Sequence, residues 1–403
     1  MPSAGDSPVE HLAPQPWMTE ATPVLAALGG SGRFVGGCVR DALLGRKIGD
    51  VDIATPLLPE EVMRRLEAAG IKAVPTGLAH GTVTAVVPPR HVEITTLRRD
   101  IETYGRHARV AFTDDWAADA ARRDFTMNAL FLDAEGEVFD PLGGLADLRA
   151  GRVRFVGDAS TRIREDVLRL LRFYRFHAHY GRGDADAAAR AACRALAPLL
   201  PSLSGERVAA ELLKLLRAAD PVPTLRLMRE DGVLAVLLPE ATRLDRLAGL
   251  VALEDAADAI RRLAALLERD AAEVAERLKL SAAERDRLLA LVVPGAPVDL
   301  AADEKTQRRL AYRRGIDLYR DQVLLAGAVT GAAERVRALL RLAETWRAIR
   351  FPLRGRDVTA LGIPAGPEVG RLLAAIEAWW EADDFSADRP ALLAELKRRV
   401  AHG

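Results

Sequence analysis

The hydrophobic pattern changes character once along the chain, near residue 158, and this change most constrains the fold. Between about residues 31 and 150, short runs typical of β-strands alternate with helical segments such as 59–69. The strand-like runs are 33–35, 50–53, 82–87, 92–97 and 129–132. Beyond residue 158, Leu and Ala recur at helical spacing, and Arg and Glu fill the outer positions. The pattern predicts an α+β protein in which a mixed head precedes an all-helical remainder.

Charge and cysteine content exclude several classes of protein. Lys plus Arg equals Asp plus Glu, at 57 each, so a nucleic-acid-binding surface must be a local patch. The two cysteines, Cys38 and Cys193, favour a reduced protein without a disulfide framework or a Cys-based zinc site. No apolar stretch is long enough to span a bilayer, and residues 1–16 resemble a loose extension rather than a signal peptide. We therefore expect a cytoplasmic protein with no membrane partner.

A glycine pair, Gly36 and Gly37, comes after the first strand-like run and opens a helical pattern. Bare backbone at such a place can approach an anion held at a helix N-terminus. Arg40 lies on the first turns of the expected helix and would serve as a counter-ion. A glycine pair alone is more often a simple turn, so the phosphate-binding interpretation depends on the acidic residues that come next in the chain.

Two carboxylates, Asp50 and Asp52, stand a few residues later with one apolar residue between them. In a strand this spacing places both on one face, where oxygen ligands suit Mg²⁺. The run 92–97 supplies a third candidate, Glu93, whose alternative role is a cross-strand salt bridge. Metal ions held by these carboxylates would activate an attacking 3′-hydroxyl and stabilise a leaving pyrophosphate. We therefore predict Asp50, Asp52 and Glu93 as catalytic residues and Mg²⁺ as the cofactor.

The segment 122–130 carries polar side chains suited to a nucleotide. Arg123 would clamp phosphate oxygens, and Asp124 or Asn128 would bond ribose hydroxyls. An Arg-Arg pair near a helix end is otherwise ordinary solvated charge.

The most discriminating element is a repeat of charged residues at every third position: Asp166, Arg169, Arg172 and Arg175. On one continuous helix they would form a single polar stripe. Cytosine and adenine place an amine donor beside a ring-nitrogen acceptor, whereas uracil and guanine present the opposite sense. A carboxylate beside a guanidinium, such as Asp166 with Arg169, therefore selects C and A. The alternative is a surface ion pair of little energetic weight.

These four motifs, in this order, resemble the class II CCA-adding tRNA nucleotidyltransferase and bacterial poly(A) polymerase family from Phe34 to about Gly181. The resemblance implies a polymerase-β-like head followed by a helical neck, body and tail. We place an N-terminal extension at 1–30, the head at 31–150, the neck at 151–205, the body at 206–300 and the tail at 301–403.

The resemblance also implies roles for single residues. It assigns Gly37, Arg40 and Arg123 to the nucleotide, and Asp50 and Asp52 to Mg²⁺. It further implies a base-reading site, whose members would be Asp166 and Arg169 as an amino-acid template, with Arg172 and Arg175 completing the pocket.

The activity expected from the resemblance is addition of C, C and A to the 3′ end of tRNA from CTP and ATP. The polar stretch 98–107 is expected to be a mobile loop of the kind that helps this family switch from CTP to ATP. Poly(A) polymerase is the runner-up, but that branch tends to carry an Arg-Arg-Phe element where this chain has 75–82.

Three further possibilities fit the residues less well. An RNA-binding protein with an inactive head would be expected to lack Asp50, Asp52 or Arg40. A small-molecule nucleotidyltransferase would not need the long helical part. Some family members carry a histidine-aspartate phosphohydrolase module, which needs several metal-ligating histidines. No His lies between His179 and His402, so we expect that module to be absent.

The C-terminal part contains a basic segment and a glycine-rich one. Residues 301–350 hold eleven Lys or Arg against six Asp or Glu. We predict that this region follows an RNA backbone, with an ordinary charged helix surface as the alternative. The predicted RNA-binding residues are Arg347, Arg350, Arg354 and Arg356. Glycine turns in 355–370 precede expected helix starts, where backbone amides can meet phosphates.

Overall fold

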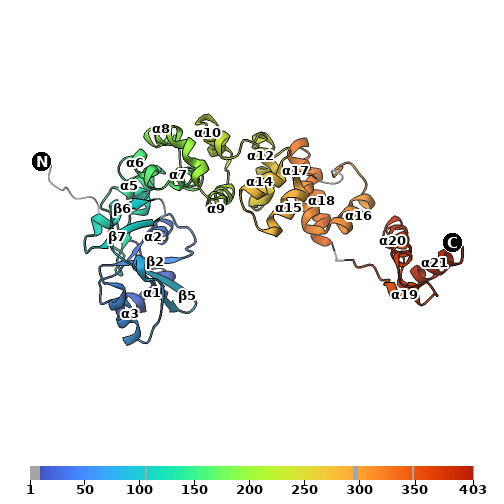
Figure 1. Ribbon diagram of the computed structural model, residues 1–403, viewed down its shortest axis with the longest axis horizontal. Coiled ribbons are helices and arrows are strands. Elements are labelled where there is room, and N and C mark those ends of the chain that lie inside the picture. Colours follow the sequence, from blue (N-terminus) through green and yellow to red (C-terminus); the bar gives the residue numbers. More distant parts are fainter. Residues whose placement is uncertain (1–9, 105–106, 294–297, 347–348, 403) are drawn as a thin grey trace. The chain divides into compact units, whose positions relative to one another are not determined.

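The computed structural model describes residues 10–104, 107–293, 298–346 and 349–402, with the backbone alone described at 100–104 and 107–110 (Figure 1). The chain divides into two compact units. The first comprises residues 1–239 with 277–279, and the second 240–276 with 280–403.

The head is built on a seven-stranded sheet with the order β3-β4-β5-β2-β1-β8-β9. Its central pair, β2 and β5, is parallel, and the other neighbours are antiparallel. All five predicted strand runs correspond to strands, although the last is shortened because Thr126–Asn128 form a 3₁₀ turn, η2. The strands are β1 Arg33–Val35, β2 Val51–Thr55, β3 Lys72–Gly77, β4 Thr82–Val87, β5 Arg90–Thr96, β8 Phe131–Leu132 and β9 Val138–Phe139.

Helix α1 (Pro16–Ala27) belongs to the head, so the predicted extension at 1–30 is wrong over this helix. It packs with α3 (Pro59–Ala68) on one face of the sheet (Figure 1). The Trp17 and Phe34 ring centroids lie 4.8 Å apart, edge to face, and both side chains are buried. Burial of these large apolar side chains stabilises the packing of the helix on the sheet.

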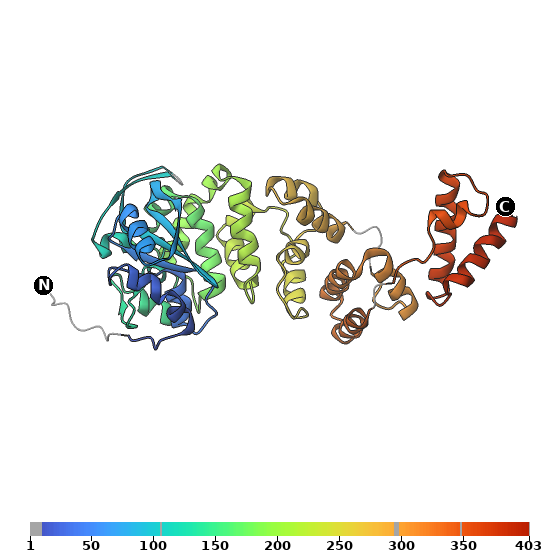
Figure 2. The ribbon, with the colours of Figure 1, turned by 90° about the horizontal axis from the view of Figure 1, so that it is seen from below.

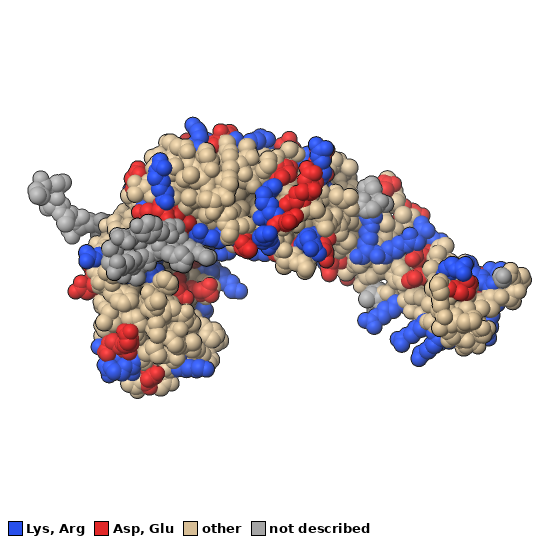
Figure 3. Space-filling model, in the orientation of Figure 1, with Lys and Arg blue, Asp and Glu red and all other residues tan. Residues whose placement is uncertain are grey.

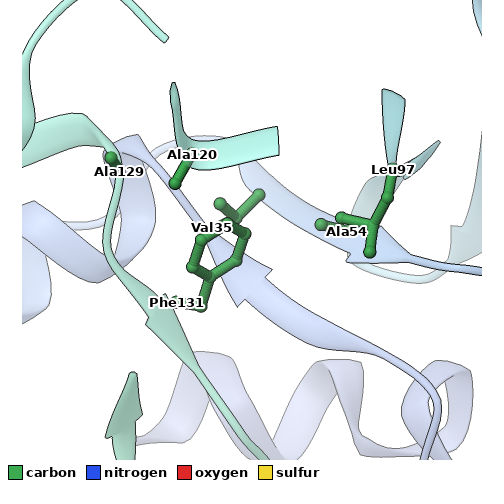
Figure 4. Close-up of a cluster of buried hydrophobic side chains, with 6 residues drawn as sticks. All are labelled: Val35, Ala54, Leu97, Ala120, Ala129 and Phe131. Carbon is green, nitrogen blue, oxygen red and sulfur yellow. The ribbon is translucent and has the colours of Figure 1, made fainter. Parts of the chain in front are cut away.

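The opposite face of the sheet has its own apolar cluster (Figure 4). Residues Val35 and Ala54 of the strands meet Ala120 of α4 (Trp116–Ala121) and Phe131 of β8 there. Because strand residues alternate between faces, Asp52, two residues before Ala54, lies on this side of the sheet. The sheet therefore separates a face covered by α1 and α3 from a face that carries the predicted metal ligand.

The polar stretch predicted as a mobile loop instead forms a two-stranded hairpin, β6 (Arg98–Tyr104) and β7 (His107–Phe112). Its antiparallel ladder runs from the Arg98–Phe112 pair to the Tyr104–His107 pair. The pairing provides hydrogen-bond partners for backbone N–H and C=O groups of both strands. The polar side chains of the stretch did not indicate this pairing.

The predicted continuous helix through the charged repeat is interrupted. Helix α6 (Ala159–Glu165) ends before Asp166, whose backbone is extended (φ −149°, ψ 107°), and α7 (Leu168–Tyr180) begins two residues later. The Asp166 carboxylate accepts a hydrogen bond from the Leu168 N–H at 3.2 Å. Such a local side-chain bond competes with helix continuation, so only the three arginines of the repeat share one helix.

Every regular element that the structure describes beyond residue 158 is a helix, as predicted. In the described part of the chain, none of these helices is long and apolar enough to cross a membrane. The remaining helices of the first unit are α2 Gly37–Leu43, α5 Gly144–Ala150, α8 Ala187–Leu196, η3 Ala197–Ser202, α9 Gly205–Leu216, α10 Val222–Glu230 and α11 Val233–Leu237, with the 3₁₀ turn η1 Leu78–His80.

The predicted boundary between neck and body at 205/206 differs from the observed packing. Helix α9 packs against α7, and the first unit continues to Pro239. The division into head, neck, body and tail stays a prediction. The helices of the second unit are α12 Leu244–Val251, α13 Ala259–Leu266, α14 Ala271–Arg277, α15 Ala282–Val292, α16 Glu304–Arg314, α17 Ile316–Thr330, α18 Ala333–Thr345, α19 Gly355–Thr359, α20 Pro367–Ala382 and α21 Arg389–His402.

The C-terminal helices share a hydrophobic cluster around Trp380 and Ile376. Helices α20 and α21 lie side by side there (Figure 2), and Tyr312 of α16 packs against the cluster. Two helices, α19 and α20, begin at Gly355 and Pro367, within the segment 355–370 where helix starts were expected.

Replacement of Trp17 tests whether α1 is part of the head core. Trp17→Ala should lower the free energy of unfolding of the first unit by about 3 kcal/mol, since it removes a buried aromatic ring. Urea denaturation followed by circular dichroism measures the change. Thr19→Ala, at an exposed position of the same helix, is the control and should unfold like wild type. Equal stability of the two variants would contradict the packing described here.

Candidate active site

The three predicted catalytic carboxylates lie together on one face of the paired strands β2 and β5, at a site called the acidic edge below. Asp52 stands directly opposite Glu93 in the parallel pairing of these strands, and Asp50 immediately precedes β2. The flanking residues Val51 and Ile53 are buried, whereas Asp52 is half-buried and Glu93 is exposed. The alternation predicted from the sequence thus places the acidic side chains on the face of the sheet that α1 does not cover.

The electrostatics of this edge favour a cation. Burial raises the pKa of Asp52 from its ordinary value of 3.8 to about 6, and the charges of Glu93 and Asp50 add to the rise, while Arg123 opposes it. A carboxylate whose charged form is disfavoured by its neighbours gains from a bound cation.

The fit to a metal ion rests on this acidic edge. Among the described residues, no three His, Cys, Asp or Glu side chains form a ready-made metal cluster. Oxygen donors from Asp50, Asp52 and Glu93 are of the kind that Mg²⁺ prefers, and a cation that keeps several waters needs only one or two of them.

The glycine turn adjoins this acidic edge. Gly36 has φ 76° and ψ −122°, a conformation that only glycine adopts readily, and its N–H donates to the Leu130 carbonyl at 3.2 Å. A Cβ atom at Gly36 would lie 3.5 Å from Arg123 Nη1. The bare backbone of the turn therefore faces a guanidinium, which is the arrangement expected for an anion site.

Arg123 occupies the centre of the site. Asp119, buried in α4, accepts from its Nε at 3.2 Å and from its Nη2 at 2.9 Å. Its charge also acts on Asp52. Burial lowers the pKa of Arg123, while Asp119 works in the opposite direction. Arg123 therefore stands close to both the glycine turn and Asp52.

Arg40, predicted as a phosphate counter-ion, is engaged within the protein. Its Nη1 donates to Asn128 Oδ1 at 2.7 Å, and its Nε and Nη2 donate to Asp41 at 3.0 and 2.8 Å. The guanidinium carbon lies 4.3 Å from the Tyr180 ring centroid. In this state Arg40 fixes α2 to η2 and to the end of α7.

Asp124 and Asn128, predicted to contact ribose, bind each other and the neighbouring arginines. Asn128 Nδ2 donates to Asp124 Oδ1 at 3.0 Å, and Arg172 Nε donates to Asp124 Oδ2 at 2.7 Å. Glu211 of α9 accepts from Arg175 Nε at 2.5 Å and lies 3.8 Å from Arg172 Nη1. A connected set of charges therefore joins the head to α7 and α9.

Asp166 and Arg169, the predicted acceptor and donor for the base, do not form the alternative ion pair with each other. Arg207 of α9 instead binds both oxygens of Asp166, from its Nη2, at 3.0 and 2.8 Å. Arg169 pairs with Glu165 and donates to the Arg162 carbonyl at 3.0 Å. The break between α6 and α7 separates the acid from the arginine, so each finds another partner.

Two family models match parts of this chain. Residues 32–154 match the family described as "Poly A polymerase head domain", and residues 186–244 match "Probable RNA and SrmB- binding site of polymerase A". The chain is 34% identical over 377 residues to the CCA tRNA nucleotidyltransferase 1, mitochondrial, of Mus musculus, covering 91% of this chain and 86% of that protein. The chain belongs to the CCA tRNA nucleotidyltransferase family.

Bacterial relatives of the family show the same likeness. The CCA-adding enzyme of Geobacillus stearothermophilus is 44% identical over 206 residues, which is 51% of this chain and 50% of that one. The crystal structure of the Bacillus stearothermophilus CCA-adding enzyme in complex with CTP superposes with a TM-score of 0.80 at 31% identity, covering 96% of this chain and 99% of that one. Members of this nucleotidyltransferase family generally use divalent metal ions.

The predicted RNA-binding arginines belong to the second unit of the chain. Arg350, Arg354 and Arg356 are exposed near α19, while Arg347 lies outside the described residues. Figure 3 shows Lys and Arg side chains projecting from one side of this C-terminal part. The same unit has a hollow of about 530 Å³, whose lining includes Arg308, Arg341 and Trp346.

The sequence analysis did not identify the residues that hold the site's arginines and acid in place, which are Asp119, Glu165, Arg207 and Glu211. Arg207 and Glu211 stand four positions apart in α9, where Glu211 is buried among apolar neighbours. A buried charge on an otherwise apolar stripe was the signal available in the sequence.

The pKa of Asp52 makes a prediction for the metal-free protein. Because this pKa is raised on folding, the folded state binds the proton more tightly, and stability falls as pH rises from about 4 through about 6. Asp52→Asn removes that penalty and should raise the free energy of unfolding by about 1–2 kcal/mol at pH 8. At pH 4 the variant should match wild type.

Urea denaturation in EDTA across this pH range measures the effect. Glu67→Gln, an exposed acid on α3, is the control and should show no such pH-dependent gain. A gain for Asp52→Asn that is equal at pH 4 and pH 8 would contradict the charge argument.

The ion pairs between head and neck make a second prediction. Asp124→Asn should lower the free energy of unfolding of the first unit by about 3 kcal/mol, since it leaves the Arg172 guanidinium without its closest carboxylate. Thermal unfolding by calorimetry measures the loss. Glu61→Gln, which removes the solvent-accessible ion pairs with Arg64 and Arg65 on α3, should lower stability much less than Asp124→Asn does. Similar effects of the two substitutions would contradict the importance of the buried pair.

Proposed function

We propose that this protein adds C, C and A to the 3′ end of tRNA from CTP and ATP without a nucleic-acid template, releasing pyrophosphate. The observation that carries the proposal is the placement of Asp52 and Glu93 side by side, next to the Gly36 turn and Arg123. Similarity to CCA-adding enzymes over nearly the whole chain supports it.

Asp50, Asp52 and Glu93 would hold Mg²⁺ at the edge of β2 and β5. When bound there, the ion lowers the pKa of the attacking 3′-hydroxyl and stabilises charge on the leaving pyrophosphate. The protein's own part is to orient these oxygens on two hydrogen-bonded strands, so that little reorganisation accompanies the reaction.

The triphosphate would lie between the Gly36–Gly37 turn and Arg123. Backbone at Gly36 is free of side-chain atoms, and Arg123 is held by Asp119 so that its guanidinium faces the turn. Arg40, Asp124 and Asn128 would then contact the nucleotide from the network in which they already take part.

Base selection would use Asp166 as acceptor and Arg169 as donor, with Arg172 and Arg175 beside them. This assignment rests on the donor and acceptor pattern shared by C and A. Substrate binding would exchange the present partner of Arg169, Glu165, for the base.

tRNA would contact exposed basic residues of the second unit, for which Arg347, Arg350, Arg354 and Arg356 are our candidates. Phosphate contacts of this type are independent of RNA sequence and weaken with added salt. A cytoplasmic location stays a prediction from composition.

Poly(A) polymerase activity is the second candidate, because residues 32–154 match a family named for the head of that enzyme. It would extend RNA 3′ ends with A from ATP alone. The two activities differ in the primer accepted and in the need for CTP.

One experiment separates these functions. Purified protein, Mg²⁺, CTP and ATP are incubated with tRNA lacking its 3′ CCA or with an oligo(A) primer, and the products are sequenced. We expect a single CCA on the tRNA and an unextended primer. Long A tails on the primer would establish poly(A) polymerase instead.

Variants tie the activity to the acidic edge. Asp52→Ala should abolish transfer while leaving tRNA affinity largely intact, because the carboxylate would hold metal rather than RNA. Mg²⁺ should raise the melting temperature of wild type but not of Asp52→Ala. Glu67→Ala is the matched acidic control and should behave as wild type. Full activity of Asp52→Ala would remove the metal assignment.

A further inference from the structure

Arg207 holds Asp166, the acid of the proposed base-reading pair. Its Nη2 donates to Asp166 Oδ1 at 3.0 Å and to Oδ2 at 2.8 Å. Oδ1 also accepts from the Leu168 N–H. Each carboxylate oxygen has two lone-pair sites, so Oδ2 retains one for another donor. Arg207 therefore orients the carboxylate without using up its capacity to accept from a base amine.

Without Arg207, Asp166 has competing partners on α7. The charge of Asp166 already acts on Arg172, and the Arg169 N–H donates to the Asp166 backbone carbonyl at 3.0 Å. Both arginines belong to the proposed reading site. A carboxylate released from Arg207 is free to turn toward them, and an ion pair formed in this way removes the acceptor and the donor together.

Helix α9 also provides an acidic partner for arginines of the site. Glu211, one turn beyond Arg207, accepts from Arg175 and lies 3.8 Å from Arg172 Nη1. Glu165 holds Arg169 from the other side. The acid and the arginines of the reading site are thus each held by an outside partner of opposite charge.

We propose that Arg207 is a positioning residue that sets the selection of C and A by holding the Asp166 carboxylate away from the arginines of α7. The inference rests on the proposed function and deepens it, since Arg207 itself acts through Asp166 rather than on the nucleotide. Its side chain is 26% exposed, so its pairing with Asp166 is partly shielded from solvent.

The test measures selection rather than activity alone. Values of kcat/KM for CTP and for UTP are determined separately on tRNA lacking CCA, and their ratio is compared among variants. Arg207→Gln should lower the ratio roughly tenfold to hundredfold, the range for loss of one well-oriented base contact. Arg207→Lys keeps the charge but not the planar donor and should fall between wild type and Arg207→Gln.

Arg190→Gln is the matched control. The Arg190 side chain is 27% exposed and also pairs with a carboxylate, Asp231, within the first unit, but it has no contact with the reading site. It should keep the wild-type ratio. Circular dichroism and thermal unfolding establish that each variant is folded before kinetics are measured.

A double-mutant comparison isolates the route of the effect. If Arg207 acts through Asp166, Arg207→Gln should cause no further loss of selection in an Asp166→Ala background. A further loss there that equals the loss in the wild-type background would overturn the proposal. So would a wild-type ratio in both Arg207 variants, or in Arg207→Lys if Arg207→Gln does not fold.

Failure of the proposed function gives a different result. A wild-type protein that adds no C to the tRNA would overturn both the function and this inference. An active and selective wild type whose selection survives loss of Arg207 would overturn the inference alone.

Discussion

The salt bridge between Arg172 and Asp124 is the contact on which the arrangement of the site depends. Arg172 belongs to α7, Asp124 comes shortly after the head helix α4, and Glu211 reaches the same guanidinium from α9. A partly buried charge needs partners of opposite charge in good geometry. The Arg172 guanidinium therefore ties α7 to the head segment after α4 and to α9. Aromatic packing of Phe125 on Phe176, with centroids 4.9 Å apart, supports the same junction.

Charge is balanced differently in the two halves of the site. Each arginine of the proposed reading site has a carboxylate partner, so this part keeps its shape without a ligand. At the edge of β2 and β5, by contrast, Asp52 faces Glu93 and Asp50 with only Arg123 opposing them. The arginines of the reading site are therefore held by ion pairs within the protein, whereas the acidic edge would gain from a bound cation.

The sequence predicted the features that local pattern determines. Alternation placed Asp52 opposite the core-facing Val51 and Ile53, and helical spacing identified the all-helical remainder. Contacts between residues distant in sequence could not be predicted in this way. Arg207 and Asp166 meet only because α9 packs on α7. The hairpin of β6 and β7 was missed for a related reason, since β6 is polar and carries no hydrophobic pattern, and its pairing with β7 is made by backbone groups.

The error at Asp166 has a physical meaning. On one continuous helix, Asp166 and Arg169 would stand three positions apart and neutralise each other as a surface ion pair. The hydrogen bond from the Leu168 N–H to the Asp166 carboxylate ends that possibility, because it stabilises a turn in place of the helix. Arg207 and Glu165 then take the separated charges. Because Asp166 and Arg169 are not paired with each other, a base amine would meet a carboxylate oxygen that keeps a free lone pair, while the ring nitrogen would draw Arg169 from Glu165.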